Sequence, residues 1–158
     1  MLKKFNMMDC KPMTTSMITK LKRLRSSESS HVEPSRYRQL IDLLMYLVNT
    51  RPDICFEVNV LSQFEVEPKH DHWITRKHIL RYLQGTIHYC LKYDRRNDVH
   101  LIGYTDSDWE DCEQDGRRST GGCFSLGSSM ISWMSWKQDT IALSSVDAEY
   151  IATYEVSK

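Results

Sequence analysis

The chain has 158 residues, of which 41% are hydrophobic and 27% are charged, and its formal net charge at pH 7 is zero. These values are typical of one folded domain or of two smaller ones, and they exclude a strongly charged disordered chain. The longest apolar run, residues 43–48, is too short to cross a bilayer, so we expect no membrane partner. No signal peptide of the usual form is recognised, which favours an intracellular location in the cytoplasm or nucleus.

The zero net charge hides an asymmetry between the two parts of the chain. Residues 1–100 hold 17 Lys and Arg against 11 Asp and Glu, whereas residues 101–158 hold 4 against 10. A basic part beside an acidic part fits a segment that faces nucleic acid next to one that binds cations. Simple attraction between the two parts is the alternative. The five cysteines are widely spaced and include no CxxC pair, which predicts reduced thiols and no zinc site.

The N-terminal segment, residues 1–33, is polar and irregular, and it ends in a serine-rich run. A basic cluster precedes that run, formed by Lys20, Lys22, Arg23 and Arg25. We expect an extended arm here, because the segment has too few apolar residues to build a core. The arm is either simply solvated or in contact with phosphates.

Residues 34–97 are predicted to form a segment of three short helices. Pro34 suits the first position of a helix whose apolar stripe is Leu40, Leu43, Leu44 and Leu47. Residues 50–53 interrupt the chain and start a second helix, with Ile54, Val58, Leu61 and Phe64 on one face and Pro68 at its end.

The third helix is predicted over residues 71–83, with one stripe formed by Trp73, Lys77, Leu80 and Leu83. Gly85 follows where a left-handed residue usually ends a helix.

The hydrophobic period changes to that of strands in residues 98–158. A strand through residues 101–104 leads into an acidic motif, and a polar turn follows up to Thr120. Two further strands are predicted at residues 121–126 and 130–136, joined by a hairpin turn at residues 127–129. Ser144 then caps a final helix, with Asp147 as its capping-box partner. The predicted fold class is α+β, in which N-terminal helices are followed by three antiparallel strands and one helix.

Two acidic residues lie where a metal site would place them. Asp106 ends the first strand and Glu149 lies on the final helix, while Asp108 shares the face of Asp106 as an auxiliary ligand. Phosphodiester hydrolysis by two metals needs several carboxylates that converge on hard cations such as Mg²⁺. The alternative is that these are solvated surface acids.

Other polar and aromatic groups point to structural roles. His70, His72 and His78 lack a fourth ligand at suitable spacing, so exposed helix-face histidines are expected. Ser144 and Ser145 fit a helix cap better than a nucleophile, because the sequence shows no histidine–acid relay. The tryptophans of the second half could stack on bases, but burial in a small sheet is the simpler expectation; these are Trp109, Trp133 and Trp136.

Over nearly its whole length the chain resembles the C-terminal part of copia-type retrotransposon Pol polyproteins. The motifs of the first part are MDCKP at residues 8–12, YRQL at 37–40, LMYL at 44–47, TRPDI at 50–54, HW at 72–73 and LRYLQGT at 80–86. Those of the second part are GYTDSDW at 103–109, RSTGG at 118–122, ISW at 131–133, KQ at 137–138 and ALSS at 142–145. The resemblance implies a segment that follows the reverse-transcriptase palm, then the first half of a ribonuclease H domain.

The same resemblance implies Asp106 as the first catalytic carboxylate and Glu149 as the second, with Mg²⁺ as cofactor if the site is functional and an RNA–DNA hybrid as ancestral substrate. The palm with its aspartate pair is absent, which excludes reverse transcription. The later strand with its metal-binding aspartate is also absent. We therefore expect a truncated ribonuclease H-like sheet over residues 98–158 without efficient nuclease activity, and a protein partner that completes the sheet.

Two alternative functions remain open from the sequence. Lys22, Arg23, Leu24 and Arg25 resemble the Arg-x-Leu-Arg translocation motif of oomycete secreted effectors, with Lys in the first position. That resemblance implies secretion into a host cell and action there through protein interactions. The third hypothesis is a nucleic-acid-binding module that uses the basic part of the chain without catalysis.

Overall fold

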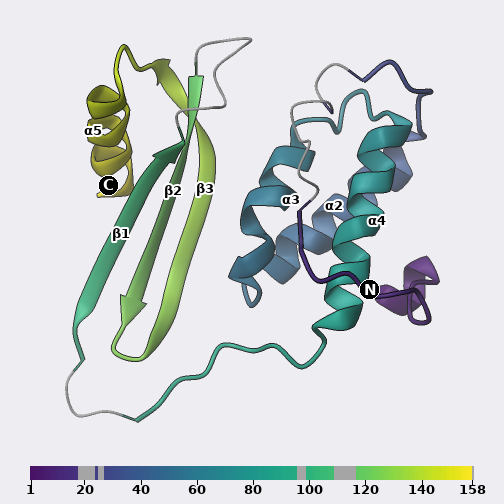
Figure 1. The fold of residues 1–158 in the computed structure, drawn as a ribbon, viewed down its shortest axis with the longest axis horizontal. Helices are drawn as coiled ribbons and strands as arrows, with labels where there is room; N and C mark the ends of the chain where they lie inside the picture. The colour runs from purple at the N-terminus through teal and green to yellow at the C-terminus, as the bar shows by residue number, and fades with distance from the viewer. Residues whose placement is uncertain (18–23, 25–26, 96–98, 109–116, 158) are drawn as a thin grey trace. The chain divides into compact units, whose positions relative to one another are not determined.

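The computed structural model describes residues 1–17, 24, 27–95, 99–108 and 117–157. The chain divides into two compact units, Met1–Cys90 and Leu91–Lys158, and each is considered by itself. The first unit contains η1 (Leu2–Phe5), α2 (Pro34–Val48), η2 (Pro52–Ile54), α3 (Cys55–Ser62) and α4 (His70–Gly85). The second contains β1 (Leu101–Asp108), β2 (Arg117–Leu126), β3 (Ser129–Ile141) and α5 (Ser145–Val156) (Figure 1). Helices precede a three-stranded antiparallel sheet, which confirms the α+β class.

Helix α2 begins at Pro34 as predicted, because proline lacks the N–H that the first helical turn leaves unpaired. The side chain of Glu33 caps this end by accepting hydrogen bonds from the backbone N–H groups of Ser35 and Arg36. The helix buries one face, formed by Tyr37, Leu40, Ile41 and Leu44. None of the helices in the described ranges is long and apolar enough to span a membrane.

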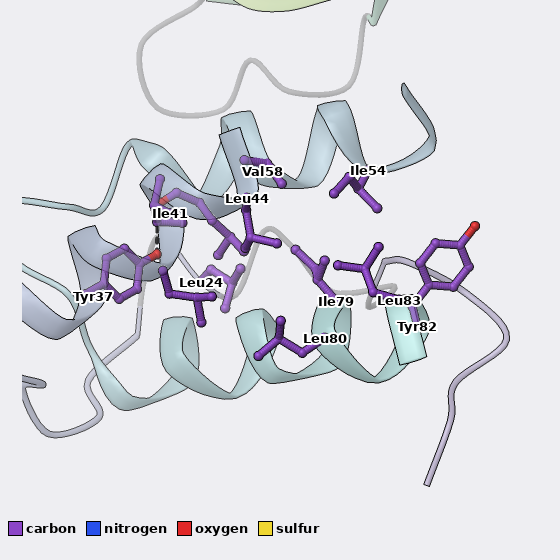
Figure 2. Close-up of a cluster of buried hydrophobic side chains, with 12 residues drawn as sticks. Leu24, Tyr37, Ile41, Leu44, Ile54, Val58, Ile79, Leu80, Tyr82 and Leu83 are labelled. Carbon is purple, nitrogen blue, oxygen red and sulfur yellow. Dashed lines mark hydrogen bonds between the residues drawn. The ribbon is translucent and has the colours of Figure 1, made fainter. Parts of the chain in front are cut away.

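The core of the first unit forms where α2, α3 and α4 bring their apolar faces together (Figure 2). Its fully buried members include Leu44, Val58 and Ile79, one from each helix. The hydroxyl of Tyr37 donates a hydrogen bond to the carbonyl of Leu61 over 2.8 Å, so the phenol also links α2 to α3. Burial of each large aliphatic side chain contributes about 1.5–3 kcal/mol, which makes this core the main source of stability in the unit.

The ends of the second and third helices differ from the sequence predictions. Helix α3 stops at Ser62, well before Pro68, because Phe64 leaves the helix and stacks on the ring of His72 at 4.0 Å. Helix α4 includes Gly85, which has no left-handed φ. The reason for glycine there is close packing, since a Cβ atom would lie 2.9 Å from the Cβ of Pro12.

Residues 11–16, which we call the N-terminal strap, lie against α3 and α4 although an extended arm was predicted for residues 1–33. The backbone N–H of Met13 donates to the carbonyl of Arg81, and the Arg81 guanidinium donates to the carbonyl of Lys11. The hydroxyl of Ser16 donates to the carboxylate of Glu57 over 2.6 Å. These hydrogen bonds hold the N-terminal strap in place although it has few apolar residues to bury.

The sheet has the order β1-β2-β3, and both pairs are antiparallel. Gly127, with φ of 61°, makes the hairpin turn between β2 and β3 as predicted. All three strands are longer than predicted, and β1 continues past residue 104 to Asp108. The predicted polar turn wrongly included Thr120, which is fully buried in β2, and β3 continues past Trp136 because Gln138 is buried as well.

Candidate carboxylate site

Asp106 occupies the second half of β1, and the strand register fixes the side of the sheet on which it lies. Asp106 is opposite Gly121, and its neighbour Thr105 is opposite Gly122. Helix α5 covers the face that carries Gly122, because a Cβ atom there would lie 2.6 Å from a methyl carbon of Val156. Successive side chains of a strand point to opposite faces. Asp106 therefore lies on the face that α5 does not cover, and it is exposed.

Glu149 lies in the first half of α5. As predicted, Ser144 caps this helix, its hydroxyl accepting a hydrogen bond from the backbone N–H of Asp147 over 3.0 Å. The Asp147 carboxylate accepts from the N–H of Leu143 and not from that of Ser144, so the reciprocal bond of a capping box is displaced by one residue. Ala148 and Ala152 are the buried residues of α5, whereas Glu149 is exposed.

Helix α5 is held on the sheet by Gln138 of β3. The Nε2 atom of this buried side chain donates to the hydroxyl of Thr120 over 2.9 Å and to the carbonyl of Ala148 over 3.2 Å. The indole of Trp136 adds a bond to the carboxylate of Glu155 at the far end of the helix. These contacts fix the backbone beside Glu149 but do not involve its carboxylate.

The two predicted catalytic carboxylates therefore belong to elements in contact, β1 and α5, but Asp106 points away from α5. The side chain of Asp108 lies outside the described residues. Among the residues described, no group of three or more His, Cys, Asp or Glu side chains is arranged to hold a metal ion. Mg²⁺ prefers oxygen ligands in near-octahedral geometry. Asp106 lies on the face of the sheet away from α5, and Glu149 lies on α5. The two carboxylates therefore do not fit one octahedral Mg²⁺ shell in this arrangement.

The three histidines were predicted to lie exposed on helix faces, and the structure agrees only in part. His72 was expected on an exposed helix face, and this was wrong: it is 2% exposed. Its Nδ1 atom accepts from the N–H of Lys69, and its Nε2 atom lies 2.8 Å from the carbonyl of Leu24. Burial lowers the pKa of this imidazole. His70 is exposed, and His78 bonds to the carbonyl of Thr15 in the N-terminal strap.

Three of the four translocation-like residues, Lys22, Arg23 and Arg25, lie outside the described residues, as do Trp109 and Cys112. The fourth, Leu24, is 7% exposed and belongs to the helical core. Trp133 and Trp136 are half-buried in β3, in line with a structural role.

A cavity in the first unit was not anticipated from the sequence. It has a volume of about 510 Å³ and is lined by residues of η1, α2 and α4 and of the segments next to them, among them Phe5, Arg36, His70, Trp73 and Lys77. The guanidinium carbon of Arg36 lies 5.1 Å from the centre of the Trp73 ring, and the Lys77 ammonium lies 5.9 Å from it. Trp73 and Lys77 are one helical turn apart in the sequence, but Arg36 joins them only through the packing of α2 beside α4.

Comparisons with known proteins place the chain among transposon-encoded proteins. It is 38% identical over 164 residues to a retrovirus-related Pol polyprotein from transposon TNT 1-94 of Nicotiana tabacum, covering 99% of this chain and 12% of that one. It is 38% identical to an uncharacterized mitochondrial protein of Arabidopsis thaliana, covering 92% and 60%. A secreted RxLR effector protein of Plasmopara viticola is 42% identical over 123 residues, covering 77% and 87%. No family model and no solved structure matches the chain.

Proposed function

Because this chain belongs to the family of copia-type retrotransposon Pol polyproteins, we propose that it is a Pol-derived segment whose ribonuclease H-type carboxylates do not form a working site by themselves. The chain spans 60% of the mitochondrial relative and 10% to 12% of the Pol polyproteins. By analogy with the family, Asp106 on the strand would be the first catalytic carboxylate. Glu149 on the helix that follows the sheet would be the second.

The observation that carries the proposal is the direction of Asp106. A two-metal hydrolase needs carboxylates that converge on cations about 4 Å apart. Here Asp106 lies on the face of the sheet that α5 does not cover, and the exposed Glu149 belongs to α5, which packs on the other face. The pair marks the ancestry of the segment and leaves the metal shell incomplete.

The test is cleavage of an RNA–DNA hybrid in the presence of Mg²⁺. We expect the purified chain to cleave no faster than its Asp106→Asn and Glu149→Gln variants, each with unchanged circular dichroism. Asp139→Asn, a change of an exposed acid on β3, is the matched control for charge. Cleavage that is robust in the wild type and in Asp139→Asn but lost in Asp106→Asn would overturn the proposal.

A second candidate function is that of a secreted effector that acts through protein interactions. The supporting observation is the 42% identity to the Plasmopara viticola protein, of which this chain covers 87%. The burial of Leu24 weighs against a translocation motif at residues 22–25, because a recognised motif needs an accessible side chain. Expression of the full chain with a reporter in the producing cell tests this candidate. Reporter found inside neighbouring host cells would favour the effector, and retention in the producing cell would contradict it.

A further inference from the structure

The N-terminal strap lies along one face of α4. The backbone N–H of Met13 donates to the carbonyl of Arg81 over 3.3 Å, and Nε of Arg81 donates to the carbonyl of Lys11 over 2.7 Å. One turn earlier in α4, Nε2 of His78 lies 2.9 Å from the carbonyl of Thr15. The strap therefore runs antiparallel to α4, and hydrogen bonds hold it at two successive turns of the helix.

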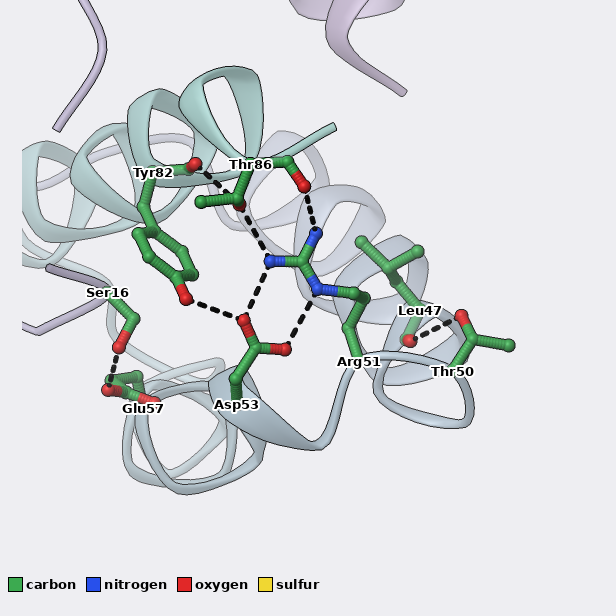
Figure 3. Close-up of polar contacts among 8 residues, drawn as sticks. All are labelled: Ser16, Leu47, Thr50, Arg51, Asp53, Glu57, Tyr82 and Thr86. Atoms are coloured by element: carbon green, nitrogen blue, oxygen red, sulfur yellow. Dashed lines mark hydrogen bonds and ion pairs between the residues drawn. The ribbon is translucent and has the colours of Figure 1, made fainter. Parts of the chain in front are cut away.

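The strap ends on a buried carboxyl group of α3. The hydroxyl of Ser16 donates to Glu57 over 2.6 Å, and Glu57 is only 6% exposed (Figure 3). Among the described residues, no lysine or arginine forms an ion pair with Glu57. A buried carboxylate without a cation is costly, and burial accordingly raises the pKa of Glu57. The closed strap therefore favours the neutral carboxyl group.

Other ionisable groups act on Glu57 from the elements packed around it. Asp53 of η2 raises the pKa of Glu57 further, and His78 of α4 lowers it. On α3 itself, Glu57 adds to the effect of burial in raising the pKa of the Cys55 thiol. The effect of burial on Glu57 exceeds those of the Ser16 bond and of His78, so the balance stays on the side of the neutral carboxyl group.

Few apolar contacts hold the strap on the unit. Pro12, Thr14 and Thr15 are exposed, and Met13 packs against the edge of the helical core. Segments with few buried apolar contacts open at a lower free energy than the core does. The strap can thus open while α2, α3 and α4 stay packed.

We propose that the N-terminal strap is a pH-sensitive latch on α3 and α4, closed while the Glu57 carboxyl group is neutral and released when it ionises. In the open state water solvates the carboxylate, so its pKa returns to the ordinary range. A pKa that is higher in the closed state stabilises this state below the open-state pKa, and the contribution is lost as pH rises through the closed-state pKa. One proton is involved, so the opening constant rises at most about tenfold per pH unit.

The latch is independent of the carboxylates of the second unit. Its residues belong to Met1–Cys90, whereas Asp106 and Glu149 belong to Leu91–Lys158. A latch that fails its test would leave the nuclease prediction untouched, and cleavage of a hybrid would leave the latch standing.

Amide hydrogen exchange of the full chain measures the opening. The protection factor of the Met13 amide, with the chemical exchange rate divided out, should fall on the order of tenfold or more between about pH 4 and about pH 8. Ile79 of α4 is fully buried and reports unfolding of the core. Met13 should exchange much faster than Ile79 at each pH, because the latch opens without unfolding the core. Equal protection of the two amides would overturn the proposal.

Three substitutions assign the pH dependence to one group. Glu57→Gln should abolish the fall in Met13 protection, because the amide does not ionise. His78→Gln, which keeps a donor for the carbonyl of Thr15 but does not titrate, should retain the fall. Glu28→Gln, a change of an exposed acid, is the matched control and should also retain it. A fall that persists in Glu57→Gln, or that disappears in His78→Gln, would overturn the proposal.

The linkage between opening and ionisation is reciprocal, which gives a second readout. Gly85→Ala should hold the strap open at every pH, because the new Cβ atom would lie 2.9 Å from the Cβ of Pro12. Met13 should then lose protection at acidic pH as well, and the pKa of Glu57, read from the ¹³C shift of its carboxyl carbon, should fall towards the ordinary range. Gly121→Ala, in the other unit, should leave both unchanged. A Glu57 pKa that stays raised while Met13 has lost protection would contradict the latch.

Discussion

Arg51 and Asp53 form a two-pronged ion pair, with the Nε–Oδ1 distance at 2.9 Å and the Nη2–Oδ2 distance at 2.7 Å (Figure 3). The same guanidinium donates to the carbonyl and the hydroxyl of Thr86 at the end of α4. The hydroxyl of Tyr82 donates to the Asp53 carboxylate. This network ties the start of η2 to the end of α4. Bidentate bonds between charged groups are among the strongest in proteins, so it stabilises the helical unit.

Asp53→Asn should lower the free energy of unfolding by about 2 kcal/mol, since it weakens charged hydrogen bonds to a largely buried arginine. Burial raises the pKa of Asp53, but the bonds from Arg51 and Tyr82 outweigh it and leave the pKa below its usual value. The contribution is therefore present above the pKa of the unfolded chain and is lost as pH falls through the lower folded-state pKa. Urea unfolding against pH measures this. Asp42→Asn, an exposed acid on α2, should change little, and an equal loss in both variants would contradict the prediction.

Glu57→Gln should change the pH dependence of stability in the opposite direction to Asp53→Asn. The Glu57 carboxyl accepts a hydrogen bond from Ser16 of the N-terminal strap. Burial raises its pKa most, Asp53 adds to this, and the Ser16 bond and His78 oppose it. A raised folded-state pKa stabilises the fold below the unfolded pKa, and this is lost as pH rises through the folded value. The stability of the Gln variant relative to the wild type should thus increase as pH rises from acidic to neutral values, because the amide stays neutral while the Glu57 carboxyl ionises. Parallel stability profiles would show that Glu57 does not titrate differently in the folded state.

Gln138→Leu should destabilise the second unit by about 2 kcal/mol, because the hydroxyl of Thr120 and the carbonyl of Ala148 lose a buried donor. The loss should be smaller when Thr120 is already Val, since one partner is then gone. Thermal unfolding of the two single variants and the double variant gives the coupling, for which we expect about 1 kcal/mol. Strict additivity would mean that the two side chains do not interact.

Gly122→Ala should cost about 2 kcal/mol, because the new methyl group meets Val156 of α5 and forces the helix away from the sheet. Val156→Ala in the same chain should recover part of the loss by opening space. Gly121→Ala provides the control, since a Cβ atom at Gly121 has no neighbour within 4 Å. Similar losses at Gly121 and Gly122, measured by denaturant unfolding, would contradict the packing of α5 on that face.

Much of the local structure could be predicted because it depends on neighbours in the sequence. Pro34 starts α2 through its missing N–H, Gly127 turns the hairpin through its left-handed φ, and Ser144 caps α5 through a bond three residues on. Predictions failed where a distant contact decided. Phe64 ends α3 by stacking on His72, and the buried Gln138 extends β3 by bonding to another strand and to α5.

The sequence by itself determined the family, the α+β order of elements, and the placement of Asp106 on a strand and Glu149 on the final helix. Only the tertiary structure decided what these residues meet. The face on which Asp106 lies follows from the pairing of β1 with β2 and from the helix packed on Gly122. The group formed by Arg36, Trp73 and Lys77 likewise requires α2 and α4 to lie side by side. Spacing along a chain fixes neighbours within one element, whereas contacts between elements depend on burial of side chains far apart in sequence.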